Sequence, residues 1–140
     1  MANRGSSKFC IHYRAMSEHS HCEKGIAYVN FQGMPFGERP CFKEKDESPR
    51  PGCEFVEFSS PEEVKAAEER TAERFKNVIK ARAAIIDDFG GPWKAGTSGK
   101  AGTINCPVCG KSKSLNYSVA GYNGHVHAAC QTENCVRWME

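Results

Sequence analysis

The sequence predicts a small α+β protein stapled by metal, with an N-terminal Cys-rich zinc module, one long α-helix and a C-terminal β-hairpin zinc ribbon. Three observations predict this class. The 140 residues contain eight cysteines, four of them in two close pairs near the C-terminus. The stretch 62–89 contains neither Gly nor Pro. The hydrophobic content of 39% is too low for one large core but adequate for small metal-stapled modules.

We expect four segments along the chain. These are an N-terminal Cys/His zinc module (1–59), a long connecting helix (60–89), a Gly-rich flexible linker (90–103) and a C-terminal zinc ribbon (104–140). No apolar run approaches the ~18 residues that a membrane span needs, and the first residues lack the apolar stretch of a secretory signal. We therefore expect a cytoplasmic protein without a membrane partner.

The N-terminal module has four widely spaced cysteines, with gaps of eleven, eighteen and eleven residues: Cys10, Cys22, Cys41 and Cys53. The segment is rich in Gly and Pro and has only short apolar runs, so it needs a stabilising metal. We expect these four thiols to bind a zinc ion. The alternatives are a site in which His12 or His21 replaces one cysteine, an iron–sulfur cluster, and four buried, reduced cysteines.

The helix has a clear start and a clear end. Ser60 fits the N-cap, Pro61 the first helical position, and Glu63 completes a capping box. Apolar residues then recur near the 3.6-residue period until Gly90-Gly91-Pro92. This stripe must be buried, either within the chain, for instance on the N-terminal module, or in a homodimer formed through residues 61–89.

The segment 90–103 is rich in Gly, Ser, Thr and Lys, as flexible tethers are. We therefore expect the ribbon to move independently of the helix.

The ribbon carries the strongest motif. Cys106 and Cys109 are separated by two residues, and Cys130 and Cys135 by four, which suits the tetrahedral coordination of zinc by four thiolates. Between the pairs, the residues around Tyr117 alternate as on a half-buried strand, and Asn-Gly marks a hairpin turn. Two disulfides are the alternative, which reducing cytosol disfavours.

The ribbon and its linker carry a local charge excess. Residues 91–140 contain five basic and two acidic residues, which favours a polyanionic partner, although an ordinary soluble surface has a similar balance. Stacking rings beside positive charge hold single-stranded nucleic acid. The candidate contact residues are Lys111, Lys113, Tyr122, His125, His127 and Arg137, whereas Tyr117 and Trp138 are expected to cover the small core.

Two other functions are considered. A host enzyme or defence complex is the alternative partner, met through the apolar helix or the basic module. Enzymatic activity is not expected, because catalytic zinc keeps an open position and four thiolates close the C-terminal site.

Both cysteine segments resemble small zinc-binding proteins of tailed bacteriophages. The segments are Cys10–Gly25 and Asn105–Glu140, with their His-Ser-His-Cys and Cys-Pro-Val-Cys-Gly motifs. The ribbon alone is similar to the zinc ribbons of phage-type primases and bacterial topoisomerase I tails, which bind single-stranded DNA. The resemblance carries over four ligands, Cys106, Cys109, Cys130 and Cys135, and implies that any role in strand synthesis would need a partner.

Overall fold

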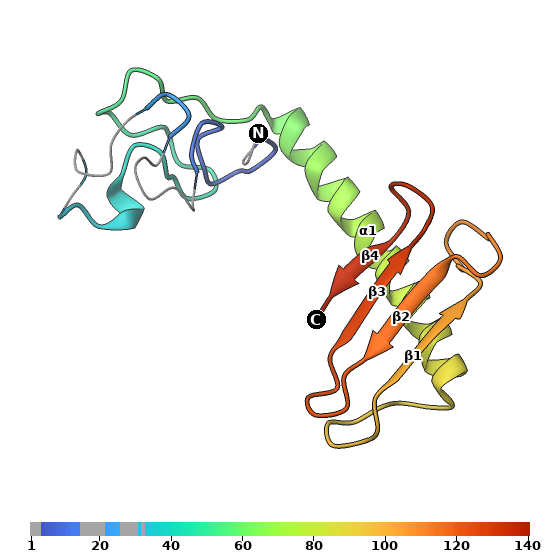
Figure 1. Ribbon diagram of the computed structural model, residues 1–140. Coiled ribbons are helices and arrows are strands. Elements are labelled where there is room, and N and C mark those ends of the chain that lie inside the picture. Colours follow the sequence, from blue (N-terminus) through green and yellow to red (C-terminus); the bar gives the residue numbers. More distant parts are fainter. Residues whose placement is uncertain (1–3, 15–21, 26–30, 32) are drawn as a thin grey trace. The chain divides into compact units, whose positions relative to one another are not determined.

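The computed structural model describes residues 4–14, 22–25, 31 and 33–140. The chain divides into two compact units, Met1–Arg70 and Thr71–Glu140. The second unit contains a four-stranded antiparallel sheet, and one long helix begins in the first unit and ends in the second (Figure 1). This is the predicted α+β class. No helix in the described part of the chain has the length and hydropathy of a membrane span.

Helix α1 (Pro61–Phe89) has 29 residues and begins with the predicted capping box. The Glu63 amide donates to Ser60 Oγ (3.2 Å), and the Ser60 amide donates to Glu63 Oε2 (2.9 Å). At the other end, the amides of Gly90 and Gly91 donate to the Ile86 carbonyl, and both glycines have positive φ. The local signals in the sequence therefore define both ends of the helix.

The sheet has the order β1-β2-β3-β4, with all neighbours antiparallel. Its strands are β1 (Lys100–Ile104), β2 (Leu115–Val119), β3 (Val126–Cys130) and β4 (Arg137–Met139). Along β2, buried and exposed residues alternate strictly, as predicted. The row Gly102, Tyr117, Ala128 and Trp138 lies on one face of the sheet, and its neighbouring rows lie on the other.

The core of the second unit lies between the end of α1 and one face of the sheet (Figure 1). Ala81 and Ile85 are fully buried against sheet residues that include Leu115 and Val126, which are also fully buried. Tyr117 and Trp138 belong to this packing, as expected from the sequence. The apolar stripe of the helix is thus buried partly within the chain. Its later part packs against the ribbon, whereas Ala67 near its start lies against Gly5 of the N-terminal module.

The segment expected to be a flexible linker is structured over much of its length. Residues 100–103 lie in β1, paired with β2, and Trp93 packs against the core and the Phe89 ring. The ammonium of Lys100 donates to the Asp88 carbonyl (2.7 Å), which ties β1 to the end of α1. The ribbon and the part of α1 that follows Arg70 therefore share one core in the structure, and independent motion of the ribbon stays a prediction.

The glycines of this segment allow close packing. A Cβ at Gly102 would lie 2.8 Å from the Tyr117 ring, and one at Gly99 would lie 2.8 Å from the Val119 carbonyl oxygen. Gly121 faces Gly99 across the same contact, with only 2.5 Å from its ideal Cβ to the Thr97 carbonyl oxygen. Glycine therefore serves here for the approach of two backbones, not for flexibility.

Gly102→Ala is expected to destabilise the second unit by about 1–3 kcal/mol, because the added methyl group overpacks a buried ring. Equilibrium denaturant unfolding with zinc present measures this loss. Gly96→Ala tests the same residue change where no atom would meet the new Cβ, although its positive φ adds a strain of its own. A Gly102 variant as stable as the wild type would contradict the packing of β1 on Tyr117.

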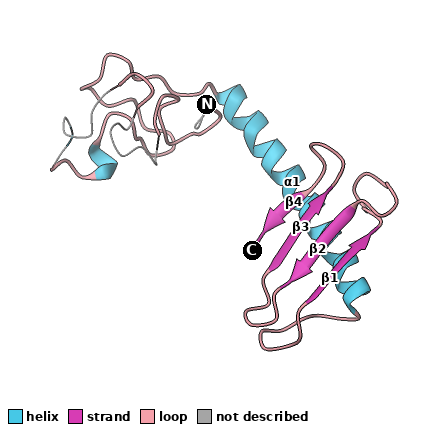
Figure 2. Ribbon diagram, viewed as in Figure 1, coloured by secondary structure: helices cyan, strands magenta, loops and turns pink. Residues whose placement is uncertain are grey.

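The described part of the N-terminal unit before α1 is nearly all loop (Figure 2). It includes the short 3-10 helix η2 (Phe36–Glu38). Backbone hydrogen bonds join its segments, among them Ile11 N to Glu57 O (2.8 Å) and Lys43 N to Lys8 O (2.9 Å). Only a few of its residues are buried in the described ranges: Cys10, Ile11, Tyr13, Arg39 and Pro40.

Candidate metal centre

Four cysteines meet at one end of the sheet. The ligand atoms of Cys106, Cys109, Cys130 and Cys135 all lie within 4.8 Å of one another. The Sγ atoms of Cys106 and Cys135 are 3.6 Å apart, and those of Cys109 and Cys130 are 3.7 Å apart. A tetrahedral zinc ion with bonds of about 2.3 Å needs sulfurs about 3.8 Å apart. The cluster therefore has the composition and dimensions of a zinc ribbon site.

The first cysteine pair lies in a tight turn between β1 and β2. The Gly110 amide donates to the Cys106 carbonyl (2.8 Å), and Gly110 has a φ of +74°. Asn105 closes the turn, because its Oδ1 accepts from the Lys113 amide (3.0 Å) and from the Ser112 hydroxyl (3.1 Å). The geometry of this turn is thus set by the chain itself, before any metal is considered.

The second pair lies between β3 and β4. The Thr132 amide donates to Cys130 Sγ (3.4 Å), and Asn134 takes a φ of +56° to return the chain to Cys135. The Cys130 amide donates to the Val136 carbonyl (2.8 Å), which closes the loop. An amide that points at the sulfur is the contact expected of a thiolate ligand.

The surroundings of the cluster shift the pKa values of its thiols in different directions. A hydrogen bond from the Thr132 hydroxyl, assisted by the Lys111 amide, lowers the pKa of Cys109 to about 6. Burial works against ionisation of Cys130, but its hydrogen bonds with Ser114 and Thr132 outweigh the effect of burial, so the pKa of Cys130 is also lowered. Burial raises the pKa of Cys135, and the neighbouring thiols raise it further. A divalent cation would let all four ionise together.

The N-terminal cysteines do not form such a compact group. Within the described ranges, the ribbon cysteines are the one set of three or more Cys, His, Asp or Glu side chains gathered within 4.8 Å. The zinc site predicted for the N-terminal module is therefore not shown. Its four cysteines nevertheless line one cavity together: Cys10, Cys22, Cys41 and Cys53.

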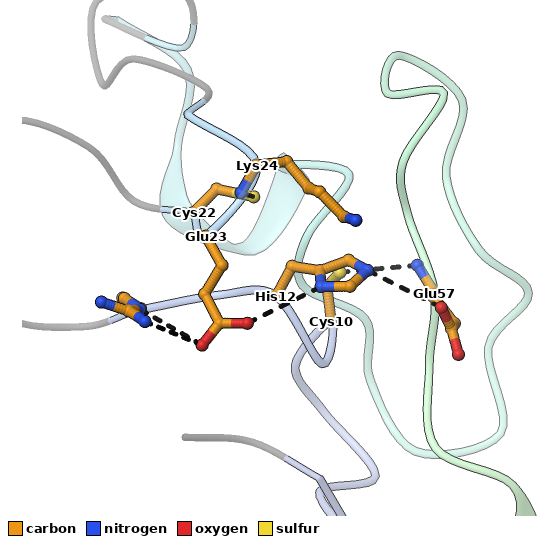
Figure 3. Close-up of polar contacts among 7 residues, drawn as sticks. Cys10, His12, Cys22, Glu23, Lys24 and Glu57 are labelled. Carbon is orange, nitrogen blue, oxygen red and sulfur yellow. Dashed lines mark hydrogen bonds and ion pairs between the residues drawn. The ribbon is translucent and has the colours of Figure 1, made fainter. Parts of the chain in front are cut away.

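The two histidines predicted as alternative N-terminal ligands, His12 and His21, have different outcomes. His12 does not line this cavity, and its ring lies between two carboxylates, 3.9 Å from Glu23 and 3.6 Å from Glu57 (Figure 3). His21 lies outside the described residues. The structure thus places His12 beside Glu23 and Glu57 rather than in the lining of the cavity.

The six predicted nucleic-acid contacts lie in three places. Lys111 and Lys113 belong to the first cysteine turn, and Tyr122 lies in the β2–β3 turn with 84% of its surface exposed. His125 donates from Nδ1 to the Glu140 carbonyl (2.8 Å). His127 and Arg137 are exposed on β3 and β4, and these two line a common groove.

This groove, of about 530 Å³, runs along β2, β3 and β4. Five of its lining residues are exposed and alternate with the residues that face the helix: Asn116, Ser118, His127, Arg137 and Met139. Arg74 of α1 joins them, with its guanidinium 3.5 Å from the Arg137 carbonyl. None of the described residues that line the groove is acidic.

Four exposed groove residues are absent from the contacts predicted from the sequence: Arg74, Asn116, Ser118 and Met139. The polar positions Asn116 and Ser118 alternate with Leu115, Tyr117 and Val119, so the same period that located the core could have located this face. Arg74 carries no such signal, because its place in the groove depends on how the helix packs.

Comparisons with protein-family models, curated proteins and solved structures found no match. The resemblance to phage zinc proteins therefore stays a prediction, and the cysteine cluster stands on its geometry.

Proposed function

We propose that this chain is a non-enzymatic zinc protein that binds single-stranded nucleic acid, DNA or RNA, along the groove of its ribbon. Zinc would be structural in this proposal. Four thiolates fill the coordination sphere of a tetrahedral ion and leave no open position for a substrate or an activated water. The zinc site at one end of the sheet would then hold the strands in register, and the exposed face of the sheet would contact the nucleic acid.

The charge of the groove carries the proposal. Arg74 and Arg137 lie within it, His127 adds a ring that a base can stack on, and acidic side chains are missing from its described lining. Arginine suits phosphate oxygens because its donors form a planar fork. Unpaired bases can reach a shallow face of this kind, whereas those of a duplex are stacked within the helix.

Arg137→Ala is expected to weaken binding of a fluorescein-labelled single-stranded oligonucleotide about tenfold at low salt. If Arg137 neutralises one phosphate, the slope of log affinity against log salt should also fall by about 0.7. Fluorescence anisotropy titrations at several salt concentrations measure both quantities. His127→Ala should weaken binding with little change of slope, because a lost stacking contact costs about 1–3 kcal/mol without releasing ions.

Lys80→Ala is the matched control. It removes one positive charge from an exposed position of α1 that does not line the groove. We expect it to change the affinity far less than Arg137→Ala does. Equal effects of the two variants would mean that binding depends only on the net charge of the protein. An absence of binding at low salt would exclude the proposal.

A protein partner is the second candidate, supported by two apolar side chains on α1. Phe75 is 65% exposed and Ile79 is 53% exposed, and they lie four residues apart on the helix. A host enzyme, a defence complex or a second copy of the chain could cover them. Co-purification of a stoichiometric protein, with no affinity for oligonucleotides, would favour this candidate.

The resemblance noted in the sequence supports a phage-encoded protein that acts in the host cytoplasm. One zinc ion, in the ribbon, belongs to this function. The second zinc ion predicted from the sequence rests on a separate observation in the N-terminal unit.

A further inference from the structure

We propose that Cys10, Cys22, Cys41 and Cys53 bind a second zinc ion as a four-thiolate site within the N-terminal unit. This site is independent of the ribbon and of its proposed partner. The four cysteines meet at a single small cavity.

The cavity has a volume of about 20 Å³, room for about one sphere of the size of a water molecule. All four cysteines of the unit line it, although they come from segments as far as forty-three residues apart. The remaining walls include the side chains of Tyr13, Pro40, Phe55 and Val56. A space with apolar walls and four sulfurs offers a cation soft ligands and little competing water, which suits zinc.

Backbone contacts hold the cysteine segments side by side. The Cys10 amide donates to the Cys41 carbonyl (2.9 Å). Cys22 forms an isolated β-bridge with Tyr13, and the Glu23 amide donates to the His12 carbonyl (2.8 Å). A Cβ at Gly52, next to Cys53, would lie 3.6 Å from the side chain of Pro40, which precedes Cys41. The fold itself therefore brings the four cysteines to the lining of one cavity.

Amides point at two of the sulfurs, as in the ribbon. The Lys24 amide donates to Cys22 Sγ (3.3 Å), the same contact, two residues on, that Thr132 makes with Cys130 Sγ (3.4 Å). The Glu57 amide donates to Cys10 Sγ (3.4 Å) from a distant segment (Figure 3). Such amides stabilise negative charge on sulfur, so they are more useful to a metal ligand than to a thiol packed in a core.

The N-terminal unit also needs a stabilising interaction besides its small core. Before α1, the described residues of this unit form the short helix η2, isolated bridges and long loops, with few buried side chains. Ordering such a loop-rich segment costs more conformational entropy than the burial of so few side chains offsets. The binding energy of zinc is available as folding energy in such small modules.

The four sulfurs are not gathered within 4.8 Å as those of the ribbon are. Zinc binding must therefore draw them inward around the cavity. Loops joined by isolated bridges can make this adjustment more easily than the strands of a continuous sheet.

The test is the metal content of the full chain and the reactivity of its cysteines. We expect two zinc ions per chain by mass spectrometry of the metal. Alkylation of the zinc-loaded wild type, mapped residue by residue, should be slow at all eight cysteines and should become fast in both groups after chelation. This readout requires no substitution, so it does not depend on a variant that folds.

Variants then assign each ion. Cys53→Ser should lose one zinc ion and keep the ribbon cysteines protected, Cys109→Ser should show the reverse, and His12→Ala should keep both ions. One zinc ion per chain, with Cys10, Cys22, Cys41 and Cys53 alkylated equally fast with and without zinc, would overturn the proposal. Iron at these four cysteines would overturn the choice of metal. The zinc content and alkylation of the ribbon site are measured separately for every variant.

Discussion

Cys106→Ser is expected to release the zinc ion of the ribbon and to unfold the four-stranded sheet. Cys106 is fully buried, and its sulfur lies 3.6 Å from that of Cys135, inside the cluster. Structural zinc contributes about 10–16 kcal/mol in zinc-finger peptides, as much as the whole stability of an ordinary domain. A serine hydroxyl is a far weaker zinc ligand than a thiolate, so the second unit should lose most of its stability.

Zinc content and tryptophan fluorescence measure this effect together, because Trp93 and Trp138 both pack against the core of the second unit. Gln131→Ala is the matched control, since it alters an exposed residue directly beside Cys130 without touching a ligand. Chelation of the wild type should reproduce the spectrum of the Cys106 variant. A Cys106 variant that keeps its sheet after complete chelation would show that the metal is not needed for the fold.

The elements that the sequence predicts well are those with local signals. The ends of α1 follow from Ser60, Glu63 and the two glycines after Phe89, all within one helical turn of the boundary they define. The ribbon ligands are equally local, because each cysteine pair forms one tight turn. The alternation in β2 likewise needs only five consecutive residues.

Tertiary contacts account for what the sequence did not predict. A Gly-rich segment has the same composition whether it is a tether or a place where backbones approach closely, and only the position of Tyr117 opposite Gly102 distinguishes the two. The presence of β1 in the sheet follows from that pairing. Similarly, an apolar helical stripe shows that burial is needed but does not identify the surface that supplies it.

For the N-terminal unit, the sequence predicts the candidate metal ligands but not how they are arranged. Its cysteines are too far apart in the sequence for spacing to define a site, and their common cavity appears only when four segments are brought together. The histidines beside them added alternatives that composition could not resolve. The carboxylates around His12 gave it another environment, and nothing in the sequence pairs Glu57 with it.

The packing of α1 on the sheet leads to the second large prediction. Ile85→Ala should destabilise the second unit by about 2–5 kcal/mol, because the side chain is fully buried between the helix and the sheet. The effect should appear as a lower midpoint of denaturant unfolding at saturating zinc, where metal loss does not contribute.

Ile79→Ala makes the same substitution on the same helix, at a position that is 53% exposed. It removes little buried surface, and alanine is the better helix former, so its effect should stay within about 0.5 kcal/mol of zero. The difference between the two variants isolates the contact of the helix with the sheet. If both were equally mild, the helix would not be docked, and residues 90–99 would act as the tether that their composition suggests. A large difference would instead mean that the ribbon and the end of the helix form one folding unit, in which the zinc site and Ile85 both stabilise the sheet.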